Sequence, residues 1–199
     1  IYYSHVSDFS QNLSIVDANT NVTRDTPLNY ANTYQLGFST SYNFSKWSWW
    51  NSFTGFNMNY QHVRSKTDFV QSTDGYNGYL YTNNDFTLNK SKSVFLGLNY
   101  AWQLPGRYQI FHISSLHMLD VSMKFLFFKK NLSLTVAAED LLNAQRPLIT
   151  YYANGIKNTV RSYQDTRSFR ISVGYKFGNK SIKSSQRDFG NEEERGRAE

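Results

Sequence analysis

Cysteine is absent from the 199-residue sequence, and no apolar run reaches the length of about 18 residues that marks a transmembrane helix. The first absence excludes disulfide bonds, a thiolate nucleophile and a cysteine-ligated metal. The second excludes a helical membrane span. The chain also lacks an N-terminal methionine and a signal peptide. We therefore expect either that a signal has been removed or that the sequence belongs to a longer protein.

Motifs for catalysis and metal binding are also missing. The four histidines are His5, His62, His112 and His117. None falls in an H-x-x-x-H or H-E-x-x-H spacing. Ser114 and Ser115 stand near two of them, but no acid is positioned to complete a nucleophilic site. We expect no catalytic residue, no metal and no cofactor.

Positive charge is in excess but dispersed. The net charge is +6, which raises the question of a nucleic-acid partner. The basic residues are scattered along the chain, apart from a cluster after residue 178. We therefore predict that the chain does not bind nucleic acid.

Aromatic and polar residues are plentiful. The chain has 15 Tyr, 15 Phe and 4 Trp, which make up 17% of it, yet its mean hydropathy is −0.57. Soluble cores are built mainly from Leu, Ile, Val and Ala instead. A wall with lipid on one side and water on the other needs both kinds of residue in alternation.

Such alternation is clearest over residues 166–178, which read TRSFRISVGYKFG. Every second residue is apolar, and the others are cationic or small. A period of two predicts a strand. The same alternation predicts strands over 34–44, 94–103, 119–127 and 132–137, and more weakly over 50–60 and 80–88. Phe53 and Phe95 break it, and each predicts either a bulge or a ring on the polar side.

Turns of two lengths alternate along the chain. Short polar turns are predicted at 45–46, 89–92 and 129–131, and long connections at 17–29, 67–77, 105–115 and 146–158. This arrangement, with aromatic residues gathered at strand ends, is typical of outer-membrane barrels. We predict an all-β fold of about eight antiparallel transmembrane strands. A soluble β-sandwich is the alternative, but the strands are too long and the turns too uneven for it.

The C-terminal third resembles a known family. Residues 137–148, AAEDLLNAQRPL, are similar to the N-D-(I/L)-F-N segment of TonB-dependent receptors, with Leu142 in place of the commoner Phe. The ending resembles that of the outer-membrane β-barrel family of Bacteroidota. The matching positions are Glu139, Asp140, Leu141, Leu142 and Asn143, then Tyr175, Phe177, Gly178, Lys180, Lys183, Glu192, Glu193, Glu194 and Arg195 or Arg197. The resemblance is specific over 132–199 and looser over 1–131.

The resemblance implies a receptor of about 22 strands with a plugged lumen. Residues 1–178 would be the C-terminal part of its barrel, and 179–199 a charged periplasmic tail. The function implied is import of a nutrient (metal chelate, glycan or peptide) across the bacterial outer membrane. The implied partners are outer-membrane lipid, the remaining strands, the plug, the TonB complex through the N-terminal part, and a surface lipoprotein.

The polar sides of the predicted strands supply the candidate site. Charged residues expected to face the lumen are Asp120, Lys124, Glu139, Arg170 and Lys176. They would line a substrate path, contact the plug, or form ordinary cross-strand pairs in a solvated lumen. Two rival hypotheses remain: a self-contained eight-stranded barrel with a structural or adhesive role, and an outer-membrane enzyme with a lipid-facing Ser/His pair.

Overall fold

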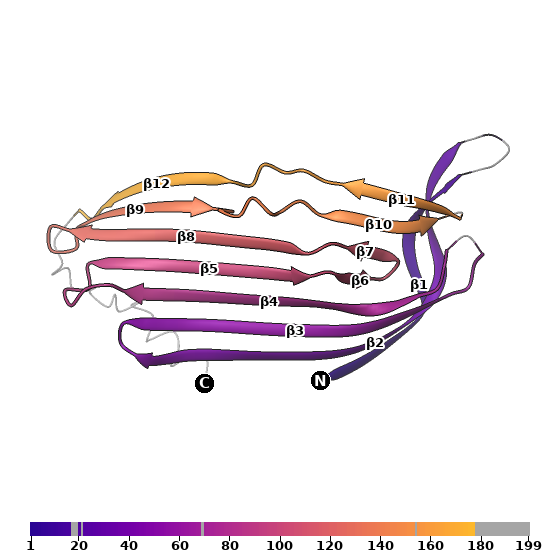
Figure 1. Cartoon of the computed structure of the whole chain (residues 1–199), viewed down its shortest axis with the longest axis horizontal. Helices are drawn as coiled ribbons and strands as arrows, with labels where there is room; N and C mark the ends of the chain where they lie inside the picture. Colours follow the sequence, from indigo (N-terminus) through magenta and orange to yellow (C-terminus); the bar gives the residue numbers. More distant parts are fainter. Residues whose placement is uncertain (17–19, 21, 69, 154, 178–199) are drawn as a thin grey trace, which may run out of the picture.

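The computed structural model describes residues 1–177 apart from 17–19, 21, 69 and 154. Its main element is one sheet of eight antiparallel strands (Figure 1). In spatial order these are β1 (Tyr2–Val16), β2 (Thr23–Trp47), β3 (Trp50–Ser65), β4 (Thr73–Thr87), β5 (Val94–Leu104), β8 (Leu116–Phe127), β9 (Leu132–Glu139) and β12 (Ser168–Tyr175). The predicted all-β fold with eight antiparallel strands is confirmed. In the described residues no helix has the length and hydrophobicity to cross a membrane.

Strand register separates the sheet into two faces, because residues opposite each other on neighbouring strands share a face. The apolar face includes Leu36, Phe38, Phe56, Met58, Leu80, Leu98, Val121, Met123, Val136 and Ile171. The polar face includes Gln35, Asn57, Tyr79, Asn83, Asn99, Asp120, Lys124, Thr135, Ala137 and Arg170. The period-two pattern of each strand is thus carried across the whole sheet.

Phe53 and Phe95 lie on the polar face. The ladders run past both residues without a register shift, so neither marks a bulge. The ring of Phe53 packs against that of Tyr81, with centroids 5.7 Å apart. Of the two predicted explanations, a ring on the polar side is therefore the correct one.

The short turns connect strands at one end of the sheet, called here the short-turn end. The predicted turns at 89–92 and 129–131 are confirmed, since β5 follows β4 and β9 follows β8 there. The predicted turn at 45–46 is wrong. Phe44 pairs with Ser52 and Trp47 with Trp50, so residues 45–46 belong to a bulge and the chain turns at 48–49. A polar dipeptide marks a bulge as readily as a turn.

The opposite, long-loop end contains more strand than predicted. β2 begins at Thr23 and β4 at Thr73, so parts of the predicted connections 17–29 and 67–77 are strand. The other two connections contain a second sheet made of β6 (Gly106–Tyr108), β7 (Phe111–Ile113), β10 (Leu148–Ala153) and β11 (Ile156–Arg161), in the order β11-β10-β7-β6. Strands of three to six residues are too short to show a convincing alternation.

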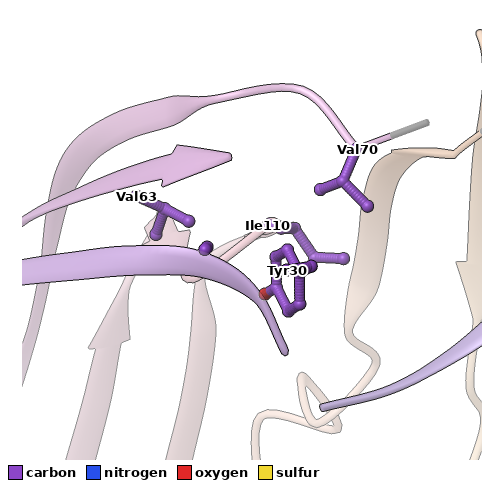
Figure 2. Packing of buried hydrophobic residues seen from close by; sticks show 5 residues of the cluster. Tyr30, Val63, Val70 and Ile110 are labelled. Carbon is purple, nitrogen blue, oxygen red and sulfur yellow. The ribbon is translucent and has the colours of Figure 1, made fainter. Parts of the chain in front are cut away.

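The buried apolar core lies at this long-loop end. Tyr30, Ala31 and Val63 are fully buried, and Val70 and Ile110 are 3% exposed. Figure 2 shows four of these side chains converging; they come from β2, β3, the β3–β4 connection and the β6–β7 turn. Burial raises the pKa of Tyr30 to about 12. We call this cluster of five residues the cap core.

A bend in the first hairpin accompanies the cap core. The pairing of β1 with β2 is irregular between Val6 and Phe9, where Asp8 adopts a φ of 54°. The backbone N–H of Asp8 donates to Asn32 Oδ1 at 3.2 Å, and its carboxylate pairs with Lys66. Because a bulge increases local twist, the outer ends of β1 and β2 curve away from the other strands (Figure 1).

The main sheet is open in the described residues. β1 pairs with β2 alone, and β12 with β9 alone. Apolar side chains of β12 are strongly exposed, with 74% for Phe169, 72% for Ile171 and 70% for Val173. Both edge strands therefore present unpaired backbone groups.

Candidate functional site on the polar face

Four of the five predicted site residues share the polar face. Asp120 and Lys124 are on β8, Glu139 ends β9, and Arg170 is on β12. Lys176 follows β12, and its backbone N–H donates to the carbonyl of Asn131 at 2.8 Å. The charged residues thus gather on one side of the sheet, over β8, β9 and β12.

Three of these charged groups have partners within the wall. Arg170 Nη2 lies 2.8 Å from Glu139 Oε1, and Ser168 Oγ donates to Glu139 Oε2 at 2.7 Å. Asp120 Oδ1 accepts the backbone N–H of Asp140 at 2.8 Å. Because the side chains of Arg170 and Glu139 are 65% and 37% exposed, their ion pair contributes only about 0–1 kcal/mol. This geometry favours cross-strand pairing over ligand binding for these groups.

Asp140 has a structural role that the sequence did not reveal. It is 1% exposed, and its carboxylate accepts hydrogen bonds from Thr166 Oγ1 at 2.6 Å and from the backbone N–H of Ala144 at 3.3 Å. Its φ is 48°, as is that of Asn143. Asp and Asn tolerate this left-handed conformation better than most residues. The motif at 139–143 therefore anchors the exit of β9 from the sheet.

The other half of the polar face is rich in amides and tyrosines, and Asp85 of β4 also lies on it. Tyr2 donates to Asn59 Oδ1 at 2.5 Å, and Asn59 Nδ2 donates to Asn77 Oδ1 at 3.2 Å. Two tyrosine rings lie directly over glycines, because a Cβ on Gly37 would be 2.3 Å from Tyr2 and one on Gly55 would be 2.4 Å from Tyr81. The absence of a side chain at each glycine thus leaves room for a tyrosine ring against the backbone, and any larger residue would displace the ring.

The hairpin of β6 and β7 is fixed against the long-loop end of this face. Asn77 Nδ2 donates to the carbonyl of Arg107 at 2.7 Å, and Thr73 Oγ1 to that of Gln109 at 2.8 Å. Gln61 Oε1 accepts the backbone N–H of Gln109 at 3.0 Å. All three side chains come from β3 and β4, so the hairpin is held by the wall itself.

Two adjoining hollows are lined mainly by residues of β4, β5 and β8, with volumes of about 190 and 210 Å³. Tyr79, Ala101 and Met118 line both. Ala101 is 7% exposed and sits between larger neighbours, which explains the depression. We call the two hollows together the Tyr79 groove.

A row of hydrogen-bonded polar side chains lies on the apolar face at the long-loop end. Ser115 Oγ is 3.0 Å from His117 Nε2, and His117 Nδ1 is 2.8 Å from the hydroxyl of Tyr100. Trp102 Nε1 also donates to Ser115 Oγ at 2.7 Å. The structure therefore brings together a serine and a histidine that the sequence had placed near each other. In a Ser/His/acid catalytic site a carboxylate would bond to the histidine, whereas here the phenol of Tyr100 does so. The indole N–H of Trp102 also donates to the serine oxygen. This arrangement suits interfacial anchoring of polar ring atoms.

Residues that could bind a metal are not clustered. Over the described residues, no group of three or more His, Asp or Glu side chains could hold a metal ion. His112, in β7, forms no part of the row that contains Ser115.

The described features define a class of protein. An antiparallel sheet with an apolar face, a polar face, aromatic rings at the short-turn end and long loops at the other is the wall of an outer-membrane β-barrel. The model of the outer membrane protein beta-barrel family matches residues 1–175, and the chain belongs to this family. The protein is accordingly one of the outer membrane. No curated protein and no solved structure matches the chain.

Proposed function

We propose that the chain is the C-terminal barrel segment of a TonB-dependent outer-membrane receptor of Bacteroidota type that imports a nutrient. The observation that carries this proposal is the open sheet, whose edge strands β1 and β12 each have one neighbour among the described residues. An open edge in hydrocarbon costs several kcal/mol for each unsatisfied backbone group. Further strands must therefore complete the wall, which favours a large barrel over one of eight strands.

The composition of the polar face supports a wide lumen. A small closed barrel fills its interior with side chains, whereas small residues such as Gly97, Ala101 and Ala137 lie on this face. In a receptor of this type the space would be occupied by a plug. The TonB complex would act on the plug, and a surface lipoprotein would cap the long-loop end. The tail at 179–199, proposed to be periplasmic, lies outside the described residues.

Nutrient dependence tests the proposed function. We would delete the gene that encodes this chain, delete TonB separately, and grow both strains on defined media in which one metal, carbon or nitrogen source limits growth. We expect at least one nutrient on which neither strain grows at low concentration. Smaller compounds that supply the same element should support growth of both strains. Growth of the first strain on every nutrient that TonB is needed for would contradict the proposal.

A further inference from the structure

We infer that the Tyr79 groove binds a neutral oligosaccharide. This inference rests on the proposed function and names its substrate class. The residues that line the groove include Tyr79, Tyr81, Asn83, Asn99, Gln103 and Gln145. None of the lining residues is Asp, Glu, Lys or Arg. Asp120 lies opposite Asn99, but its Oδ1 accepts the backbone N–H of Asp140.

The amides of the groove have free hydrogen-bonding capacity. Gln61, Asn59 and Asn77 all bond to the wall or to the β6–β7 hairpin. By contrast, the side chains of Asn83, Asn99, Gln103 and Gln145 make no hydrogen bond within the part of the chain that the structure describes. Each primary amide can donate two hydrogen bonds and accept two. Four such groups along the groove, two in each hollow, match a ligand rich in hydroxyl groups.

Strand register arranges these groups in rows. Tyr79 lies opposite Gln103, and Asn83 lies opposite Asn99, with Tyr81 and Ala101 between them. The four-residue step from one row to the other spans about 13 Å along the strands. An aromatic ring and an amide thus stand at one end and two amides at the other. This length suits an extended ligand of more than one ring.

The aromatic floor favours sugar over other neutral ligands. The centroids of the Tyr79 and Tyr81 rings are 5.7 Å apart, and the edge of the Tyr81 ring lies over Gly55. A pyranose can place its C–H groups on such rings while its hydroxyls reach the amides. An extended peptide instead binds through an unpaired strand edge, and β4, β5 and β8 are each paired on both sides.

Binding to the purified full-length protein in detergent tests the inference. The probe is an array of immobilised neutral oligosaccharides of varied linkage, with polygalacturonate and hexaglycine as charged and peptide comparisons. We expect at least one neutral oligosaccharide to bind in preference to both comparisons. Tyr79→Ala should weaken that binding about tenfold or more, as loss of a central aromatic anchor does.

Two further variants guard against misfolding and non-specific effects. Ala101→Leu fills the hollow without removing a hydrogen bond and should also abolish binding. Tyr76→Ala removes a 59% exposed ring from the same strand but from the apolar face, and should leave binding unchanged. The inference is overturned if no neutral oligosaccharide binds, or if binding is indifferent to both Tyr79→Ala and Ala101→Leu.

The outcome is separable from that of the proposed function. Binding by the purified protein needs neither TonB nor transport, whereas the growth test needs both. Sugar binding without a shared nutrient defect would support the groove and contradict the receptor. A shared nutrient defect without sugar binding would support the receptor and contradict sugar binding by the groove.

Discussion

Asn84 is a primary amide on the apolar face of β4, opposite Leu98. A bare amide facing hydrocarbon costs several kcal/mol. The structure satisfies it, because Trp50 Nε1 donates to Asn84 Oδ1 at 3.1 Å and Asn84 Nδ2 donates to Thr82 Oγ1 at 3.0 Å. Thr54 and Thr82 hydroxyls lie 2.9 Å apart and extend the chain. These four side chains, from two neighbouring strands, form a self-contained polar track on the lipid side.

Replacing Thr82 with the isosteric valine should therefore be costly. The change leaves an amide N–H of Asn84 and the Thr54 hydroxyl without their partner, and we expect a loss of about 1–3 kcal/mol in the free energy of unfolding. Urea unfolding of the protein in lipid vesicles measures it.

Thr40→Val is the matched control for this change. Thr40 is exposed on the same face, opposite Phe56, and its hydroxyl bonds to no other side chain in the described residues. Its replacement should be neutral or stabilising in lipid. Equal effects of the two valines would show that the polar track does not stabilise the wall.

This residue scale is where sequence reasoning was weakest. The alternation over 50–60 and 80–88 is faint because Ser52, Thr54, Thr82 and Asn84 occupy apolar-face positions. The partners of Thr54, Thr82 and Asn84 are up to 34 residues away in sequence, so no local pattern could reveal that these side chains satisfy their hydrogen bonds. The amides of the Tyr79 groove also come together only in the sheet, where the pairing of β4 with β5 places Asn83 opposite Asn99.

At the scale of elements, the β6–β7 hairpin depends on one close backbone approach. A Cβ added to Gly106 would lie 2.1 Å from the carbonyl oxygen of Tyr76. Backbone cannot rotate away as a side chain can, so Gly106→Ala should push the hairpin off β4 and weaken the hydrogen bonds of Asn77 and Thr73. Limited trypsin digestion after Arg107 measures the result, and we expect faster cleavage in the variant.

Gly174→Ala provides the comparison for the hairpin. Its added Cβ would lie 2.9 Å from Ser133 Oγ, a hydroxyl that can rotate, and the site is on β12 at the other end of the chain. Cleavage after Arg107 should stay at the unmodified rate in this variant. Equal cleavage rates in the two variants would show that the close approach of Gly106 to β4 does not hold the hairpin in place.

β8 and β12 were predictable because the ranges 119–127 and 166–178 repeat the period-two pattern over eight or more residues. β1 was not among the strands predicted from alternation. The bulge at 45–46 looks like a turn because Ser and Lys suit both. The second sheet was missed because its strands are short and their pairing partners, such as Ile149 and Ile113, are distant in sequence.

At the scale of the whole molecule, the open sheet links the fold to the function. Its edge strands β1 and β12 each have one neighbour among the described residues, and the proposed receptor supplies the further strands and a plug. The family could be suspected from the C-terminal motif, and membership is shown over residues 1–175. Substrate and partners are not encoded in any local pattern, because they depend on surfaces to which several strands contribute.

The size of the native protein distinguishes a segment of a large receptor from a complete eight-stranded barrel. An antibody raised against residues 181–199 would be used to blot outer membranes, boiled and unboiled, after electrophoresis in detergent. We expect a heat-modifiable band several times heavier than the 23.2 kDa of this chain. A heat-modifiable band at 23.2 kDa would contradict it, because eight strands would then close a barrel by themselves.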